Sequence, residues 1–133
     1  MTTASFDRIR LYLHELGGVV EIADQATGIF VVSKPELGIQ QLVIGCADPL
    51  LILEQHLVTL PEPTLRIYQR LLQKNRDIIH GAFVLDESGR RVIFRDTLQL
   101  ATLDRDELGA CFNSLGLLLS EFAVELIAFS TAE

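Results

Sequence analysis

The feature that most constrains the fold is an apolar stripe near the C-terminal end of the chain. Asp104 and Glu107 form an acidic capping box there, and Leu103 and Leu108 occupy the positions of a hydrophobic staple. Large apolar side chains then recur at alternating steps of four and three positions, at Leu108, Phe112, Leu115, Leu119, Phe122, Leu126 and Phe129. This spacing predicts one α-helix of about 25 residues with a continuous apolar face. Such a helix needs a wide apolar surface to pack against.

Two glycines interrupt this predicted helix on a neighbouring face. Gly109 and Gly116 lie seven positions apart. A glycine inside a helix costs about 1 kcal/mol relative to alanine. We therefore expect another part of the backbone to pack closely against this face.

The first half of the chain carries strand signals after one short helix. Residues 5–16 have apolar side chains at helical spacing, with Ser5 as the expected cap and a glycine pair at the end. Residues 19–23, 29–33 and 39–46 follow as β-branched runs separated by turn-forming residues. Residues 50–58 fit either a helix, for which Asp48 and Pro49 would be a good start, or a strand. The tight turn before this run and its short length favour a strand.

The second half has a helix and a hairpin before the long C-terminal helix. Thr59 and Glu62 match a capping box, which predicts a helix that runs to about residue 75. Its expected apolar face consists of Leu65, Tyr68, Leu71 and Leu72. Residues 80–96 are predicted to form two strands with alternating apolar side chains, joined by a turn that contains a glycine. The element order is α-β-β-β(-β)-α-β-β-α, which predicts an α+β fold with an antiparallel sheet. The length of 133 residues predicts a single domain over 1–133.

Composition limits which classes of partner and which cellular compartment we expect for this protein. The formal net charge is −7, which argues against a nucleic-acid partner because such binding depends on basic contacts to phosphate. The N-terminus has no basic segment followed by an apolar one, so no secretory signal is expected. The apolar stretch from Leu115 to Phe129 is interrupted by Glu121 and Glu125, so we expect no membrane span. We therefore predict a cytoplasmic protein, in which Cys46 and Cys111 are free thiols.

Few residues are spaced for catalysis or for holding a cofactor. Glu54 and His56 would share one face of a strand and could form an acid–base pair. Glu121 and Glu125 could act as paired carboxylates. In both cases a solvated polar surface is the preferred interpretation. Phosphate-binding glycine loops, nucleophile elbows and zinc-protease spacings are missing from the sequence, so we expect no enzyme, no cofactor and no metal.

Two surface features indicate association with another protein. Four basic residues, Arg66, Arg70, Lys74 and Arg76, lie on or just after the second helix. They either contact an acidic partner or phosphate, or form a solvated face that pairs with carboxylates of the same chain. The chain also has more large aliphatic side chains than its small elements need, and a large exposed apolar patch marks an interface.

Three segments of the second half resemble a known family. LRIYQRLLQKN (65–75) is followed by GAFVLDESGRRVIFRDTL (81–98) and LDRDELGACFNSL (103–115). This order resembles the YbjN-like and Tir chaperone (CesT) group, with the type III secretion chaperone-like fold. The resemblance implies a homodimer that holds an extended segment of a partner protein, without chemistry or cofactor. It also implies that Leu65, Tyr68 and Leu72 contact the second subunit or the partner, and that Asn75 is a helix C-cap. The alternative that it leaves open is a YbjN-like regulatory protein without a dedicated client.

Overall fold

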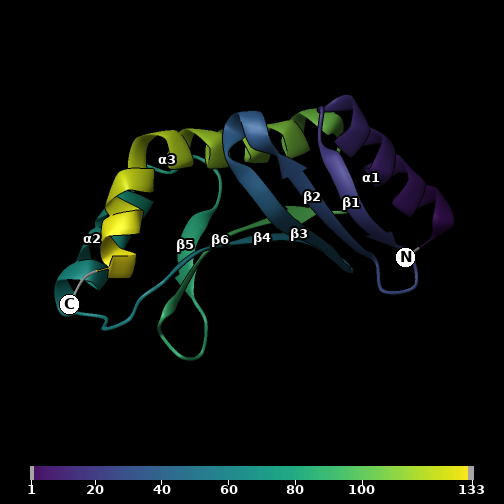
Figure 1. Ribbon diagram of the computed structural model, residues 1–133. Coiled ribbons are helices and arrows are strands. Elements are labelled where there is room, and N and C mark those ends of the chain that lie inside the picture. Colours follow the sequence, from purple (N-terminus) through teal and green to yellow (C-terminus); the bar gives the residue numbers. More distant parts are fainter. Residues whose placement is uncertain (1, 132–133) are drawn as a thin grey trace.

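The computed structural model describes residues 2–131, in which six antiparallel strands form one sheet with three α-helices (Figure 1). The elements are α1 (Thr3–Glu15), β1 (Val19–Asp24), β2 (Ile29–Lys34), the 3-10 turn η1 (Pro35–Leu37), β3 (Ile39–Ala47), β4 (Leu50–Thr59), α2 (Leu65–Asn75), β5 (Ala82–Leu85), β6 (Arg91–Gln99) and α3 (Arg105–Thr131). The strand order across the sheet is β1-β2-β3-β4-β6-β5. The predicted α+β class and element order are confirmed, and residues 50–58 belong to a strand.

The structure corrects two predicted helix starts. Thr59 is the last residue of β4, where it pairs with Arg91 of β6, so it does not cap a helix. Helix α2 begins instead at Leu65, and its cap is Thr64, whose hydroxyl accepts the N–H of Ile67 at 3.3 Å. In the same way, the cap of α1 is Thr2 and not Ser5.

Helices cover one face of the sheet and leave the other face open. Helix α3 crosses over the sheet, α1 lies at the β1 end, and α2 lies beside the C-terminal half of α3 (Figure 1). In β2, Phe30 and Val32 are buried beneath the helices, whereas Ile29 is exposed on the open face. This alternation follows from the two-residue period of a strand. The buried core therefore lies between the sheet and the α1–α3 layer.

The predicted stripe of α3 is the side that packs on the sheet. Leu108, Phe112, Leu115, Phe122 and Leu126 are buried, and Leu119 and Phe129 pack at the margin of the core. By length and composition α3 could also cross a membrane, but the core helix of a soluble protein passes the same test, and ten of its residues are buried here.

The two glycines of α3 do mark close approaches, although the neighbours are side chains and not backbone. A Cβ at Gly109 would lie 3.0 Å from Cδ2 of Leu16, at the end of α1. A Cβ at Gly116 would lie 3.1 Å from Cβ of Leu37, in η1. The glycines therefore let α1 and η1 approach the helix.

Helix α2 is rotated relative to the prediction. Its buried residues are Ile67 and Leu71, whereas Leu65 and Leu72 are exposed to solvent. The helix has apolar side chains on two sides, and the sequence pattern favoured the side that the fold leaves outside. Only Leu71 of the predicted face is fully buried.

Asn75 ends α2, but its side chain does not cap the helix. Its Oδ1 accepts the N–H of Phe83 at 2.7 Å, and its Nδ2 donates to the carbonyl of Phe83 at 3.2 Å. Both groups belong to the outer edge of β5, which has β6 as its strand neighbour on the other side. The carboxamide therefore takes the place of a further strand and protects this sheet edge.

Gly81, before β5, is required by its conformation and by its surroundings. Its φ is +85°, and a Cβ would lie 2.5 Å from Cζ of the buried Phe94. We expect Gly81→Ala to lower the free energy of unfolding by about 2–6 kcal/mol, because left-handed strain and overpacking each cost about 1–3 kcal/mol. Urea unfolding measures this change. Gly45→Ala is the matched control, since nothing lies within 4 Å of its added methyl; equal losses in both variants would contradict this account.

Cys111 tests how tightly α3 packs. Its side chain is buried in the core, and burial, together with the nearby Asp96 carboxylate, raises the pKa of its thiol. Because the thiolate is the reactive form, raising the pH to 8 should leave Cys111 unreactive toward Ellman's reagent in the folded protein. We expect Cys111 to react about 100-fold or more slowly than in the unfolded chain, since labelling requires the core to open. The Cys46→Ser variant isolates this thiol; rapid labelling of it would show that α3 is loosely held.

Candidate functional site

The outer side of α2 carries an exposed apolar strip. Leu65 is 86% exposed and Leu72 is 71% exposed. Tyr68 lies between them along the helix and is half-buried, and its hydroxyl donates to the carbonyl of Gly89 in the β5–β6 turn at 2.8 Å. These are the three predicted contact residues, and we call them the α2 strip. Their contact with a second subunit or a partner stays a prediction.

Ion pairs hold α2 against α3. Arg70 Nε lies 2.8 Å from Glu125 Oε1, and Lys74 Nζ lies 3.6 Å from Glu121 Oε2. Both cations also lie over the ring of Phe122, at 5.4 and 5.5 Å from its centroid. The hydrogen bond to Glu125, and then its charge, raises the pKa of Arg70. The two glutamates are therefore not a free carboxylate pair, and two of the four basic residues pair within the chain.

The open face of the sheet carries apolar side chains around one ion pair. Residues that oppose one another across the strands form a transverse row, Ile22–Val31–Val43–Glu54–Arg95. Ile22 and Val43 are exposed. At the other end of the row, Arg95 Nη1 lies 3.5 Å from Glu54 Oε1. Along this row the face is therefore apolar over β1–β3 and carries one ion pair over β4 and β6.

Glu54 and His56 share this face, as the strand assignment predicts, but each has a different partner. Glu54 pairs with Arg95, and His56 Nε2 is 3.0 Å from the hydroxyl of Thr59. No hydrogen bond joins Glu54 to His56 within the described part of the chain. The pair therefore has the geometry of two separate surface contacts and not of an acid–base dyad.

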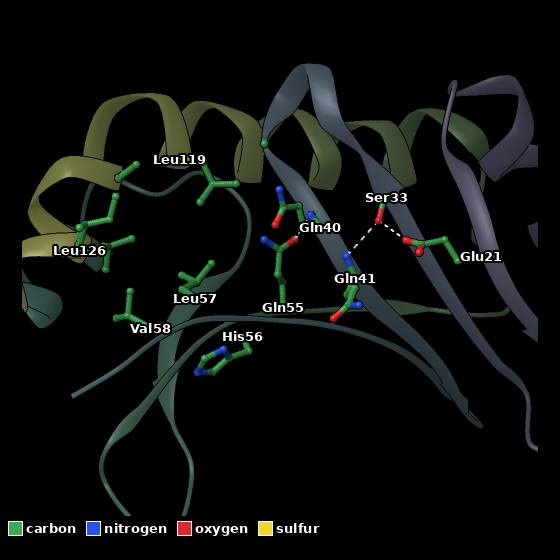
Figure 2. Close-up of a pocket in the computed structure, with 13 residues that line it drawn as sticks. Glu21, Ser33, Gln40, Gln41, Gln55, His56, Leu57, Val58, Leu119 and Leu126 are labelled. Atoms are coloured by element: carbon green, nitrogen blue, oxygen red, sulfur yellow. Dashed lines mark hydrogen bonds between the residues drawn. The ribbon is translucent and has the colours of Figure 1, made fainter. Parts of the chain in front are cut away.

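A cavity of about 700 Å³ lies between β3, β4 and the C-terminal half of α3 (Figure 2). Its volume falls within the range of about 300–1,000 Å³ that ligand pockets occupy. Gln55 of β4 stands in it (Figure 2), although its side chain is only 5% exposed. Gln55 was not among the residues predicted from the sequence. The signal was present, because Glu54, Gln55 and His56 interrupt an otherwise apolar run.

Within residues 2–131, His, Cys, Asp and Glu side chains form no group of three or more that could hold a metal ion. The two cysteines are free thiols, as predicted. Cys46 is half-buried, and burial raises its pKa too. Both thiols therefore behave as apolar side chains at neutral pH.

Solved structures with the same fold include secretion chaperones. E. coli YbjN superposes with a TM-score of 0.66 at 12% identity, over 90% of this chain and 91% of YbjN. A chain of the ExsC–ExsE complex gives 0.67 at 16% identity, over 100% of this chain and 98% of that one. The complex of the Yersinia pestis type III secretion chaperone SycH with a YscM2 fragment gives 0.59 at 17% identity, over 92% and 98%.

No curated protein matches this sequence significantly. The sequence profile of the CesT_Tir_1 family, in contrast, matches residues 2–132, which is nearly the whole chain. This match agrees with the resemblance of residues 65–115 and extends it to the first half of the chain. The chain therefore belongs to the CesT_Tir_1 family.

Proposed function

We propose that this protein is a non-enzymatic, chaperone-like binding protein of the cytoplasm that forms a homodimer and holds an extended segment of a partner protein. The observation that carries the proposal is exposed apolar surface on an otherwise well-packed domain, above all the α2 strip. Leu65 and Leu72 are large side chains with no neighbour to cover them in the described chain, and such patches on soluble proteins mark interfaces. The family match and the chaperone complexes with this fold support it.

The α2 strip is the proposed dimer contact. Its helix is held in place from behind by the Arg70–Glu125 and Lys74–Glu121 pairs, so the strip is presented on a rigid element. Two copies of the strip related by a two-fold axis would bury Leu65 and Leu72 against each other, as an isologous interface requires.

Charged substitutions on the strip should separate the subunits. We expect the wild-type chain to sediment as a dimer and Leu65→Glu/Leu72→Glu to sediment as a monomer, with an association constant at least about 100-fold weaker because four carboxylates would meet at the interface. Analytical ultracentrifugation measures this equilibrium. Leu117→Glu/Val124→Glu is the matched control, since it places the same charges on exposed aliphatic positions of α3.

Three results would reject the dimer contact. If the wild-type protein is a monomer, there is no dimer. If the strip variant is still a dimer, the subunits contact each other through another surface. If the control variant is also a monomer, the loss of the dimer is not specific to the strip. Circular dichroism of each variant separates dissociation from unfolding.

The partner is tested by affinity capture of the tagged protein from its native host, with mass spectrometry and limited proteolysis. A captured protein that is protected over a short segment supports the chaperone-like role. The alternative is a regulatory role without a dedicated client, which the likeness to YbjN favours, since YbjN is proposed to regulate transcription. Changed transcript levels on deletion, with no captured partner, would favour that alternative.

A further inference from the structure

The cavity between β3, β4 and the C-terminal half of α3 lies where the β3–β4 ladder has ended. The ladder stops at the pair Val43–Glu54, and beyond it β3 stays beside β2 while β4 stays beside β6. The carboxamide of Gln55 closes the gap between the strands, because its Oε1 accepts the N–H of Gln40 at 3.2 Å. This hydrogen bond therefore closes the cavity on the sheet side, and α3 covers the opposite side (Figure 2).

The two halves of this cavity differ in polarity. Side chains from the end of β4 and from α3 make one half aliphatic, and they are Leu57, Val58, Leu119, Ala123, Leu126 and Ile127. The other half is polar and comes from β1, β2 and β3, through Glu21, Ser33, Gln40 and Gln41. Figure 2 shows the labelled aliphatic side chains on one side of Gln55, and Gln41, Ser33 and Glu21 on the other. A ligand with a hydrocarbon part and a polar head fits this division.

A β-bulge in β3 lies at the polar half. Val32 pairs with Leu42 and Lys34 pairs with Ile39, so β3 has one more residue than β2 between these two pairs. Gln41 lies in this bulge with a φ of +52°, which is the only positive φ among the non-glycine residues of the described chain. Side chains other than glycine rarely adopt this conformation, and strained positions of this kind cluster at ligand-binding sites. The strained residue therefore lies where the lining of the cavity becomes polar.

Hydrogen bonds from the bulge hold a carboxylate at this end of the cavity. The N–H of Gln41 donates to the hydroxyl of Ser33 at 3.1 Å, and that hydroxyl donates to Glu21. Glu21 takes part in none of the ion pairs formed within residues 2–131. The carboxamides of Gln40 and Gln41 line the same half and add carbonyl oxygens that can accept hydrogen bonds. The polar half is therefore rich in acceptors.

The charge of the lining selects the sign of the head group. Lysine and arginine are absent from the lining that the described chain provides, and the whole chain has a net charge of −7. His56 is the other titratable side chain of the lining, and its Nε2 lies 3.0 Å from the hydroxyl of Thr59. An ammonium group has three N–H donors and no acceptor, so it complements a carboxylate surrounded by carbonyl oxygens. A carboxylate or phosphate head would instead meet Glu21 as a like charge.

We propose that this cavity binds a protonated aliphatic primary amine, with its hydrocarbon chain in the aliphatic half and its ammonium group at Glu21. A polyamine is disfavoured, because a second ammonium group would lie unpaired against aliphatic side chains. The site is separate from the α2 strip, so its occupation does not depend on the proposed dimer.

Three eight-carbon probes that differ only in the head group test this site. They are n-octylamine, 1-octanol and sodium octanoate, each titrated at about pH 7 into the full chain labelled with nitrogen-15. The amine is protonated there, because its pKa is close to that of lysine, about 10.4. Octylamine should bind about fivefold or more tightly than octanoate, with octanol between them. The amide resonances of Gln40, Leu57 and Ala123 should shift on binding.

Glu21→Gln removes the charge and keeps the shape of the cavity. This variant should bind octylamine about two- to fivefold more weakly, which is the range for an exposed ion pair, and should bind octanol unchanged. Glu87→Gln is the matched control, since Glu87 is exposed in the distant β5–β6 turn, and it should leave all three affinities unchanged.

Ala123→Trp tests the aliphatic half. The indole would occupy the space of the octyl chain, so all three probes should bind about tenfold or more weakly. Val124→Trp adds the same ring one position later, on the exposed side of α3, and should leave the affinities unchanged. The amide spectrum of each variant without a probe shows whether it is folded.

Four results would overturn this proposal. If the three probes bind equally, the head group is not recognised. If octanoate binds most tightly, the site prefers the opposite charge. If octylamine binds but neither Glu21→Gln nor Ala123→Trp weakens it, the amine binds elsewhere. If no probe shifts the named resonances, the cavity does not take such a ligand. None of these results affects the dimer contact, which sedimentation of the α2 strip variant tests by itself.

Discussion

The packing of α3 across the sheet is the contact on which the other elements depend. Its stripe from Leu108 to Leu126 covers the inner face of the strands, and that face has no other cover of comparable length. Along the same helix, Leu16 at the end of α1 packs against Gly109, and Leu37 of η1 packs against Gly116. Farther along, Glu121 and Glu125 bind α2. One helix therefore positions α1, the β2–β3 connection and α2.

The helices and strands whose sequence patterns are long or unambiguous could be predicted from the sequence alone. The α3 stripe repeats over more than five turns, so its helix, its cap at Asp104 and its buried face could all be predicted. Residues 50–58 were ambiguous, and the turn before them decided correctly for a strand. The predicted cap residue of α2 was wrong because strand pairing overrides the local sequence pattern. Thr59 has a capping pattern, but its pairing with Arg91 keeps it in β4, and Thr64 takes the capping role.

The features of the candidate sites depend more on register than on sequence pattern. Leu65, Tyr68 and Leu72 were singled out as part of the apolar face of their helix and, through the family resemblance, as a contact with a second subunit or partner. Which apolar side of the helix packs on the core cannot be decided without the core. Gln55 was missed although a polar interruption of an apolar strand marks it, whereas the end of the β3–β4 ladder at Val43 and Glu54 could not be found, since each strand keeps its other neighbour beyond that point. No local sequence pattern indicates where two neighbouring strands separate.

Two different kinds of surface lie on different elements of the fold. The α2 strip is exposed and apolar, and it is the proposed contact between folded subunits. The cavity between β3, β4 and α3 is a recess that Gln55 enters from β4 and that aliphatic side chains of α3 line.

The position of α3 in the chain also affects how the protein is made. All six described strands precede it, so during synthesis the residues of the inner face, among them Phe30, Leu42, Leu53 and Phe94, leave the ribosome before the helix that covers them. Apolar segments exposed in this way are prone to aggregation. The interval before α3 emerges is therefore the stage of synthesis at which these residues are most exposed to it.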